Sequence, residues 1–516
     1  MTSSGRHQVA RSAVHHPGRW LALGVLVLAV LLVAVDATVL GLATPFLSED
    51  LQPSGTQLLW IGDVYSFVIA GLLVSMGSLG DRIGRKKLLL TGAVAFGAVS
   101  VLNAYASSPE MMILARALLG VAGATLMPST LALIRNIFHD AEERSFAIGI
   151  WGAAASAGAA VGPVVGGFLL ENFWWGSVFL INVPVMLVLV LVGIKLLPES
   201  KDPSPGPWDL LSVVLSLVGI ICFVYAVKEA AAHGLAWGTG LTGLAGLAAL
   251  FWFVRRQLTL PSPLLDMRLF HHRGFSGAVL ADLLTILGLS GLVFFLSQFL
   301  QLVQGRTPLE SGLIELPAAA GAVVAGLSAG YVARRLSVRI AVSGGLVALG
   351  LGLLTCTVVT ADTGVPMLVA AMIVGGIGAG LAFTVTADVI LSSVPKEQAG
   401  AASAVSETAY ELGAALGIAV LGSIVTGIYR SFRVPPGTPA DVADAAHDSL
   451  GGAVEAAESL PADQAAALVA AAQDAFTDGF QAGAWVGSVV LFVTAVAASF
   501  MLRGQKLAKG IVDDIP

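Results

Sequence analysis

The sequence predicts an all-α integral membrane protein with fourteen membrane-spanning helices. The chain has 516 residues, of which 56% are hydrophobic and only 12% are charged, whereas soluble domains carry about 25% charged residues. Most of the charged residues lie between apolar runs of about 20 residues, the length needed to cross a hydrocarbon core roughly 30 Å thick. This pattern excludes a soluble domain, and the net charge of −6 gives no reason to expect a nucleic-acid partner.

Fourteen apolar runs account for the predicted spans. The first of them follows a basic tail, as a signal peptide would, but its apolar core is too long and no small-residue cleavage site follows it. The predicted spans lie near residues 20–46, 58–79, 88–106, 111–134, 146–170, 175–197, 208–228, 238–254, 274–303, 309–333, 340–361, 366–391, 400–428 and 480–502.

The distribution of Lys and Arg residues sets the expected orientation. An even number of spans puts both termini on one side, and that side holds most of the cations between the spans. Only four cations fall on the opposite side: Lys228, Arg306, Arg430 and Arg433. Because cytoplasmic loops carry the excess of positive charge, we expect a multi-pass plasma-membrane protein with both termini cytoplasmic.

Small residues dominate the span near 146–170. In water such a helix would be weak, since each Gly costs about 0.8–1 kcal/mol relative to Ala, but in lipid the backbone must satisfy its own hydrogen bonds. Two glycines four residues apart let a second helix approach closely, and a proline permits a bend. These features fit a functional contact between helices, or alternatively an ordinary packing face of small residues. The residues concerned are Gly149, Gly158, Gly162, Pro163, Gly166 and Gly167.

Charged residues occur inside several spans of the first half of the chain. Asp36 lies within the first span and Arg116 within the fourth. Ionisable groups at this depth are costly and usually face a pathway or a partner. Asp63 lies about one turn inside the second span between Trp60 and Tyr65. The two aromatic residues are consistent with an interfacial belt, or with an aromatic and acidic approach to a cation site.

The second half of the chain has further acids within its spans. Asp282, Glu315 and Asp388 could each bind a cation or lie at a helix interface. The segment Glu407-Thr-Ala-Tyr410-Glu411 puts two carboxylates on one helix face. Because like charges repel and burial removes water from both, we expect at least one of the pair to hold a proton near neutral pH.

Two further segments have an open interpretation. The loop after the second span reads Gly77-Ser-Leu-Gly-Asp81-Arg82-Ile-Gly84-Arg85, which by itself fits a tight turn with positive-inside charge. The long segment 429–479 has eight acids against two arginines. We interpret it as a solvated spacer, or alternatively as a vestibule that weakly attracts cations. Leu468, Ala472 and Phe476 suggest a short amphipathic helix on the outer surface.

Several of these segments resemble motifs of the major facilitator superfamily. The 77–87 segment resembles the superfamily's loop motif, which implies a latch between the two halves formed by Gly77, Asp81, Arg82, Gly84 and Arg85. The 149–167 spacing resembles the antiporter motif of its exporters, which implies export by exchange and disfavours an uptake symporter.

The first and fourth spans also resemble this superfamily. The Arg116 segment is similar to a motif linked to proton transfer, although Leu119 stands where the family usually has Gln. The segment around Asp36 resembles the signature of fourteen-helix drug:proton antiporters, although Gly41 replaces their usual Asn. The closest resemblance is to the Qac-type and Smv-type exporters of quaternary ammonium compounds and cationic dyes.

The resemblance implies a major facilitator fold of two six-helix bundles plus an inserted helix pair. A weak internal repeat, in which 77–86 aligns with 330–339, fits that division. The expected parts are a cytoplasmic tail 1–19, a bundle 20–197, an inserted pair with linkers 198–273, a bundle 274–502 containing the outer loop 429–479, and a tail 503–516.

The implied function is proton-coupled efflux of lipophilic cations by alternating access, by a protein that is not an enzyme. The chain contains no Gly-Lys-Ser or Gly-Lys-Thr phosphate loop, so we expect an ion gradient to drive transport, and neither cofactor nor metal. The alternatives are an exporter of one specific metabolite or antibiotic of the host, and a membrane receptor without flux. We expect a monomer that binds small hydrophobic cations, protons and lipid.

Antiport requires groups that hold either a proton or a substrate cation. We assign proton coupling to Asp36, Arg116, Glu407 and Glu411. We assign substrate binding to Trp60, Asp63, Tyr65, Asp282, Glu315 and Tyr410.

Overall fold

The computed structural model describes residues 18–203, 208–234 and 236–505, and all regular structure within them is helical. The expected tails 1–19 and 503–516 fall mostly outside this part of the chain. Fourteen of the described helices are long and apolar enough to cross a membrane. The prediction of an all-α, fourteen-span membrane protein is confirmed.

The first half of the chain forms seven helices before the inserted pair. The span predicted near 175–197 is interrupted after its first turn, so two helices share it. These helices are α1 (Arg19–Leu51), α2 (Gly55–Ile83), α3 (Arg85–Ala104), α4 (Pro109–Ile137), α5 (Ala141–Asn172), α6 (Ser177–Leu180) and α7 (Asn182–Leu196). The inserted pair is α8 (Leu210–His233) and α9 (Trp237–Thr259).

The second half begins with a short 3-10 turn, η1 (Met267–His271), and ends with the longest helix of the protein's described part. A π-helical turn, η2 (Phe299–Val303), closes α10, and a 3-10 turn, η3 (Lys396–Gln398), precedes α14. The helices are α10 (Arg273–Gln298), α11 (Pro308–Leu336), α12 (Val338–Cys356), α13 (Val365–Ser392), α14 (Ala399–Tyr429), α15 (Ala440–Asp448), α16 (Leu450–Ala457) and α17 (Ala462–Met501).

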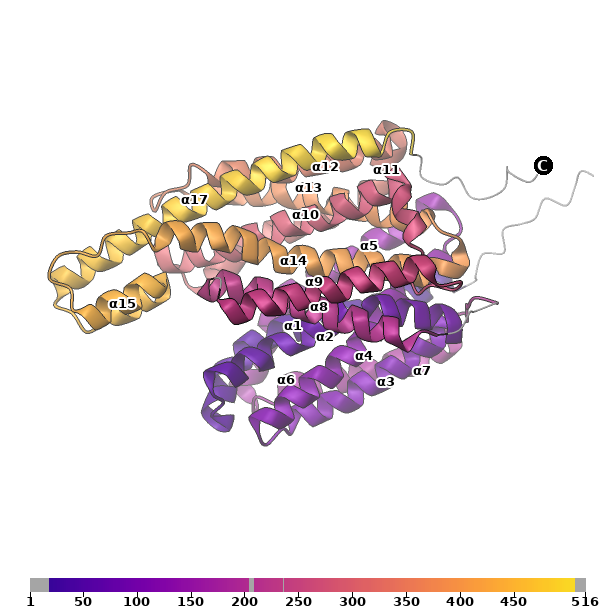
Figure 1. Cartoon of the computed structure of the whole chain (residues 1–516), viewed down its shortest axis with the longest axis horizontal. Helices are drawn as coiled ribbons and strands as arrows, with labels where there is room; N and C mark the ends of the chain where they lie inside the picture. Colours follow the sequence, from indigo (N-terminus) through magenta and orange to yellow (C-terminus); the bar gives the residue numbers. More distant parts are fainter. Residues whose placement is uncertain (1–17, 204–207, 235, 506–516) are drawn as a thin grey trace, which may run out of the picture.

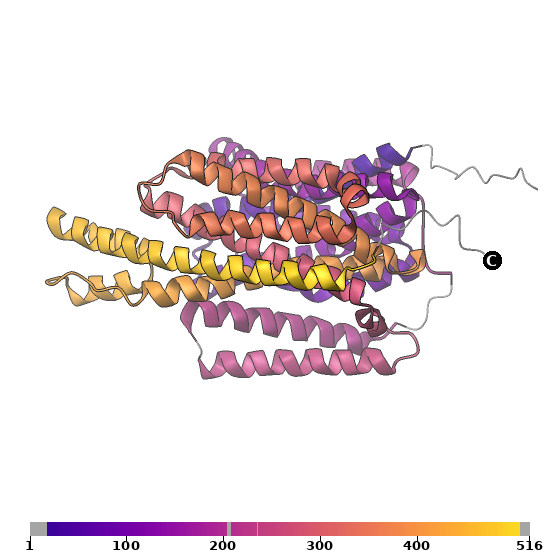
Figure 2. The ribbon, with the colours of Figure 1, turned by 90° about the horizontal axis from the view of Figure 1, so that it is seen from above.

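The helices pack as two groups that contact each other directly, through α5 with α11 and α2 with α14 (Figure 1). In the N-terminal bundle, defined as α1–α7, α1 packs on α5, α2 on α4 and α3 on α7. In the C-terminal bundle, defined as α10–α17, α11 and α12 both pack on α13, and α10 packs on α14. Helices α8 and α9 lie side by side at the edge of the molecule (Figure 2), and α8 contacts both α2 and α14. The inserted pair therefore contacts a helix of each bundle.

The two ends of the molecule differ in composition. At one end α1 begins and α17 ends, and we call it the basic end because Arg85, Arg144 and Arg334 lie there. The opposite end carries α15 and α16, and we call it the loop end (Figures 1 and 2).

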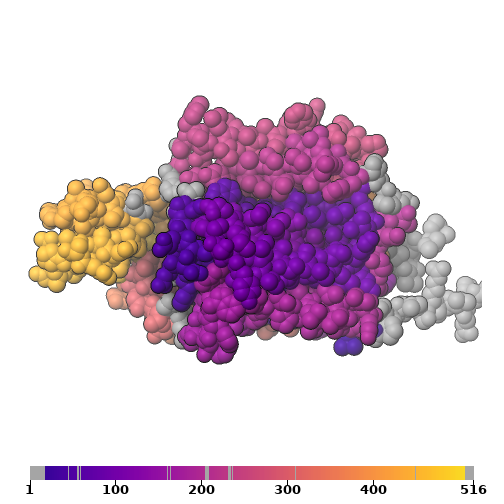
Figure 3. Space-filling model, turned by 90° about the horizontal axis from the view of Figure 1, so that it is seen from below, coloured from indigo at the N-terminus to yellow at the C-terminus, as the bar shows by residue number. Residues whose placement is uncertain are grey.

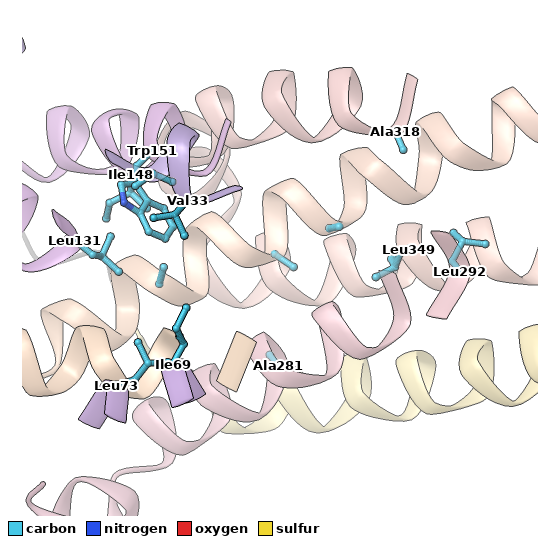
Figure 4. Packing of buried hydrophobic residues seen from close by; sticks show 14 of the residues in the cluster. Val33, Ile69, Leu73, Leu131, Ile148, Trp151, Ala281, Leu292, Ala318 and Leu349 are labelled. Atoms are coloured by element: carbon cyan, nitrogen blue, oxygen red, sulfur yellow. The ribbon is translucent and has the colours of Figure 1, made fainter. Parts of the chain in front are cut away.

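One cluster of buried apolar residues extends through both bundles. Figure 4 shows Trp151 and Ile148 of α5 beside Val33 of α1, with Leu131 of α4 nearby. The same cluster includes Ala281 of α10 and other residues of the C-terminal bundle. Since lipid provides no hydrophobic drive between helices, this contact must come from close packing rather than from exclusion of water.

The segment 429–479 is folded, so the expected solvated spacer is wrong. Helix α17 runs without a break for 40 residues from this segment into the bundle. Leu468, Ala472 and Phe476 are buried on its first turns, where α17 packs against α16. The Tyr429 hydroxyl donates to the Ala446 carbonyl at 2.7 Å. The resulting helical extension projects from the loop end (Figure 3).

Candidate functional site

At the basic end, a carboxylate near the end of α2 in the N-terminal bundle caps the first turn of α14 in the C-terminal bundle. Asp81 accepts hydrogen bonds from the backbone N–H groups of Gly400 and Ala401, at 2.9 and 3.0 Å. The N-terminus of α14 favours a negative charge at this position because its first N–H groups have no partner within the helix. Asp81 therefore joins the two bundles.

Arg85 completes this junction. Its guanidinium pairs with Asp81 at 2.6 Å and donates to the carbonyls of Lys396 and Glu397 at 2.8 and 2.9 Å. Gly84 turns the chain between α2 and α3 with a φ of 112°, a conformation that favours glycine. Arg82 donates to the Ser78 hydroxyl, one turn earlier on α2.

Gly77 lies where α2 and α14 almost touch. A Cβ at this position would collide with the backbone of Gly400. The glycine therefore allows the two helices to approach, and the 77–87 segment has the geometry of a latch between the bundles, with Asp81 and Arg85 at its centre.

A second charged junction lies at the basic end, where Asp388 has the interface position that its sequence left open as one of two alternatives. Asp388 of α13 is fully buried and accepts from Arg144 at 2.7 Å and from Ser145 at 2.5 Å, both on α5. Arg334 of α11 pairs with Glu142 of α5. The unusual charge inside a span was the available signal, but it did not identify the partner.

Two buried residues of the N-terminal bundle, both assigned to proton coupling, form an ion pair. Asp36 of α1 accepts from Arg116 of α4 at 3.1 Å and from the Asn182 amide at 2.9 Å. All three side chains are at most 3% exposed. The Arg116 guanidinium also lies over the Tyr65 ring, 4.5 Å from its centroid.

The C-terminal bundle places its acids on facing helices. Asp282 of α10 accepts from the hydroxyls of Ser406 and Thr386, at 2.8 and 3.2 Å. Glu407 follows Ser406 on α14 and is 4% exposed, whereas Glu411, one turn on, is half-buried. The three carboxylates are thus brought into one region of the bundle.

Aromatic rings line the middle of the junction between the bundles. Trp151 of α5 stacks on Phe383 of α13 with centroids 6.2 Å apart, and Phe383 meets Tyr410 of α14 edge-on at 5.9 Å. Tyr410 is 37% exposed. An aromatic surface of this kind can receive a flat or cationic ligand.

The expected grouping of Asp63 with Trp60 and Tyr65 holds only in part. Asp63 is paired with Lys228 of α8 at 2.5 Å, and Trp60 stacks on Tyr225 of α8 with centroids 6.0 Å apart. Tyr65 instead faces Arg116, because it lies two residues further along the helix and on another face. In the sequence, Lys228 counts as one of the four outer cations, and its spacing does not predict this pair.

Glu315 of α11 stands apart from these groups. It is half-buried, and its Oε1 atom has no hydrogen-bond partner among the described residues.

The glycines of α5 pack mainly on α1, within their own bundle. A Cβ at Gly158 would lie 2.6 Å from the Leu31 carbonyl oxygen, and one at Gly162 would collide with the Thr38 hydroxyl. Gly166 also packs on α1, and a Cβ at this position would lie 3.2 Å from the Val39 side chain.

The two ends of the motif behave differently from its centre. Gly149 contacts the other bundle, at Gly326 of α11, whereas Gly167 has open space around it. Pro163 belongs to the helix, and its side chain is outside the described ones. The close helix approach is confirmed, but its partner is the α1 segment that carries Asp36.

Comparison with known proteins agrees with this geometry. The model of the Major Facilitator Superfamily matches residues 26–417. The chain is 47% identical to the multidrug efflux pump LfrA of Mycolicibacterium smegmatis, covering 94% of this chain and 96% of that one. It is 38% identical to the methyl viologen resistance protein SmvA of Salmonella typhimurium, covering 94% and 98%.

A solved structure shows the same fold. The human organic anion transporter MFSD10 (TETRAN) superposes with a TM-score of 0.59 at 15% sequence identity, covering 92% of this chain and all of that one. The resemblance that the motifs indicated is confirmed, and the chain belongs to the Major Facilitator Superfamily.

Proposed function

We propose that this protein exports lipophilic cations, such as quaternary ammonium compounds, cationic dyes and biguanide-like antiseptics, in exchange for protons. The observation that carries the proposal is the group of carboxylates Asp282, Glu407 and Glu411 in the C-terminal bundle. The hydrogen bonds described for Asp282 come from hydroxyls rather than from a cation. A buried carboxylate in this setting can be neutralised by a proton or by a cationic ligand.

A site that holds either a proton or a substrate cation, but not both at once, exchanges one for the other. A substrate cation favours the charged carboxylate and displaces its proton, and a returning proton displaces the cation. Neighbouring Glu407 and Glu411 are expected to titrate as one coupled unit. The names of LfrA and SmvA support a drug substrate, and methyl viologen, named with SmvA, is itself a dication.

The closed basic end supports alternating access. Asp81, Arg85 and Arg144 hold the bundles together there, so this structure corresponds to a state closed at the basic end. The positive charge at this end supports its placement in the cytoplasm, with both termini, in the plasma membrane. Both bundles come from one chain, which supports a functional monomer.

The test uses purified protein in liposomes with an imposed pH gradient, acid inside. Adding methyl viologen or ethidium to the outside should collapse the gradient, while neutral drugs should not. Glu458→Gln, which changes an exposed acid of the extension, is the control and should behave as wild type. Equal responses to neutral drugs and to cations would contradict the cation assignment. A cation-dependent uptake without any pH change would contradict proton coupling.

A further inference from the structure

Helix α8 brings a lysine into contact with the acidic side chain at the loop-end half of α2. The Lys228 ammonium lies 2.5 Å from Asp63 and 5.2 Å from the centroid of the Phe67 ring. The side chains of Lys228 and Asp63 are 34% and 35% exposed, so the fold encloses neither of them. The pair is therefore open to exchange, unlike the buried pair Asp36–Arg116.

The surroundings of this ammonium have the chemistry of a site for an alkylammonium ion. Trp60 and Tyr225 stack beside it with their planes 10° apart. Helix α8, which carries Lys228, also packs on α14 of the C-terminal bundle, which carries Glu411. The ammonium thus lies against the Asp63 carboxylate and beside aromatic rings, which attract organic cations.

We propose that Lys228 is a tethered competitor for the substrate: its ammonium occupies the Asp63 carboxylate until an organic cation displaces it, and returns when the substrate leaves. The proposal rests on the proposed function, because it assumes a cationic substrate. Lys228 is then a specificity-determining residue. It belongs to the inserted pair of helices, and the motifs of the two bundles do not define the role of that pair.

The energetics permit such an exchange. A partly exposed ion pair contributes little to stability, so its separation costs little. The tether holds the ammonium at an effective concentration in roughly the millimolar range, which is enough to compete with weakly bound cations. A ligand with several charges or a large aromatic surface gains more than lysine does, and it displaces the lysine.

The test is equilibrium binding by calorimetry to purified full-length protein, with tetraphenylphosphonium as the monocation and methyl viologen as the dication. Lys228→Gln removes the charge, and Lys228→Met is a second variant that keeps the apolar stem. Lys228→Arg is the matched control that retains a cation.

We expect Lys228→Gln and Lys228→Met to bind methyl viologen about tenfold more tightly and the monocation about threefold more tightly, because the electrostatic gain grows with ligand charge. Lys228→Arg should bind as wild type. In an Asp63→Asn background, Lys228→Gln should bring no gain, since the vacated carboxylate is absent.

General damage to the fold would not make a variant bind organic cations more tightly. If both uncharged variants bind these cations as wild type does, or less tightly, the competitor role is wrong while the proposed function stands. If neither wild type nor any variant binds either cation, the proposed function fails and this inference with it.

Discussion

In the N-terminal bundle the buried carboxylate of Asp36 faces a guanidinium, whereas in the C-terminal bundle Asp282 faces two hydroxyl groups. Both acids are at most 3% exposed. In this structure a carboxylate with a cation beside it has its charge balanced by that cation, whereas one with hydroxyls alone needs a proton or a ligand to balance its charge. Burial by itself therefore does not define the role of an acid. The group that lies beside its carboxylate does.

The largest expected effect comes from Asp36→Asn. It leaves Arg116 as a buried cation without a counter-charge, which costs about 3–5 kcal/mol, and it should abolish substrate-induced proton release measured with a pH dye. The double variant Asp36→Asn/Arg116→Gln should recover thermal stability and still release no protons. Full release by Asp36→Asn would remove this acid from coupling.

The next effect concerns the α5 surface that positions α1. Gly162→Ala should displace the Thr38 side chain and shift Asp36, so export should fall by more than half while most of the protein still folds. Gly167→Ala, where a methyl group meets open space, is the matched control and should export normally. Resistance of cells to ethidium, normalised to protein abundance, measures both, and equal behaviour of the two variants would contradict the packing argument.

Glu407→Gln and Glu411→Gln should affect stability less than Asp36→Asn does. Neither change leaves a buried arginine unpaired, so the thermal midpoint should stay at or above that of wild type. Glu411→Gln should weaken methyl viologen binding about tenfold, since it removes one charge near the loop-end approach. Glu407→Gln should reduce proton release instead. A marked loss of stability in either variant would show that these acids are structural.

A smaller effect is expected for Asp282→Asn. The amide oxygen can still accept from Ser406 or Thr386, so the loss of stability should be about 1 kcal/mol or less. Ser406→Ala is the comparison, because it removes the donor and keeps the acid. Melting curves in one detergent measure both, and a loss as large as that of Asp36→Asn would erase the distinction between the bundles.

The smallest effect concerns Asp209, at the membrane boundary before α8. Two hydrogen bonds from Arg256, at 2.6 and 2.9 Å, lower the pKa of this carboxyl to about 2. A depressed pKa contributes stability above the unfolded value near 3.9 and loses it as the pH falls through about 2. Asp209→Asn should therefore lower the melting temperature slightly and equally at pH 5 and pH 8, and a difference between the two would contradict the ion pair.

The sequence predicted the spans well because they follow from local patterns. Apolar runs long enough to cross a bilayer leave little choice of structure, and the loop at 77–87 carries its motif within a few residues. The contact of Asp81 with Gly400, more than 300 positions away, agrees with the expected role of that motif.

Partners between distant helices could not be predicted in the same way. Residue spacing gives the depth of Lys228, Asp388 or Tyr65 in the membrane, but not the direction in which each helix faces its neighbours. Tyr65 and Asp63 are two residues apart and so lie on different faces of α2. The extension was predicted only in part: Leu468, Ala472 and Phe476 indicated a short helix, but the spacing could not show that this helix is continuous with the last span or that α16 packs on it.

The unbroken course of α17 has a practical consequence for imaging. Forty residues of α-helix measure about 60 Å, twice the thickness of a hydrocarbon core, so the extension continues rigidly from a transmembrane helix beyond the lipid or detergent belt. Small transporters without such a projection look alike from many directions in electron micrographs. Here the asymmetric extension supplies a landmark by which single-particle images can be aligned without an added antibody fragment.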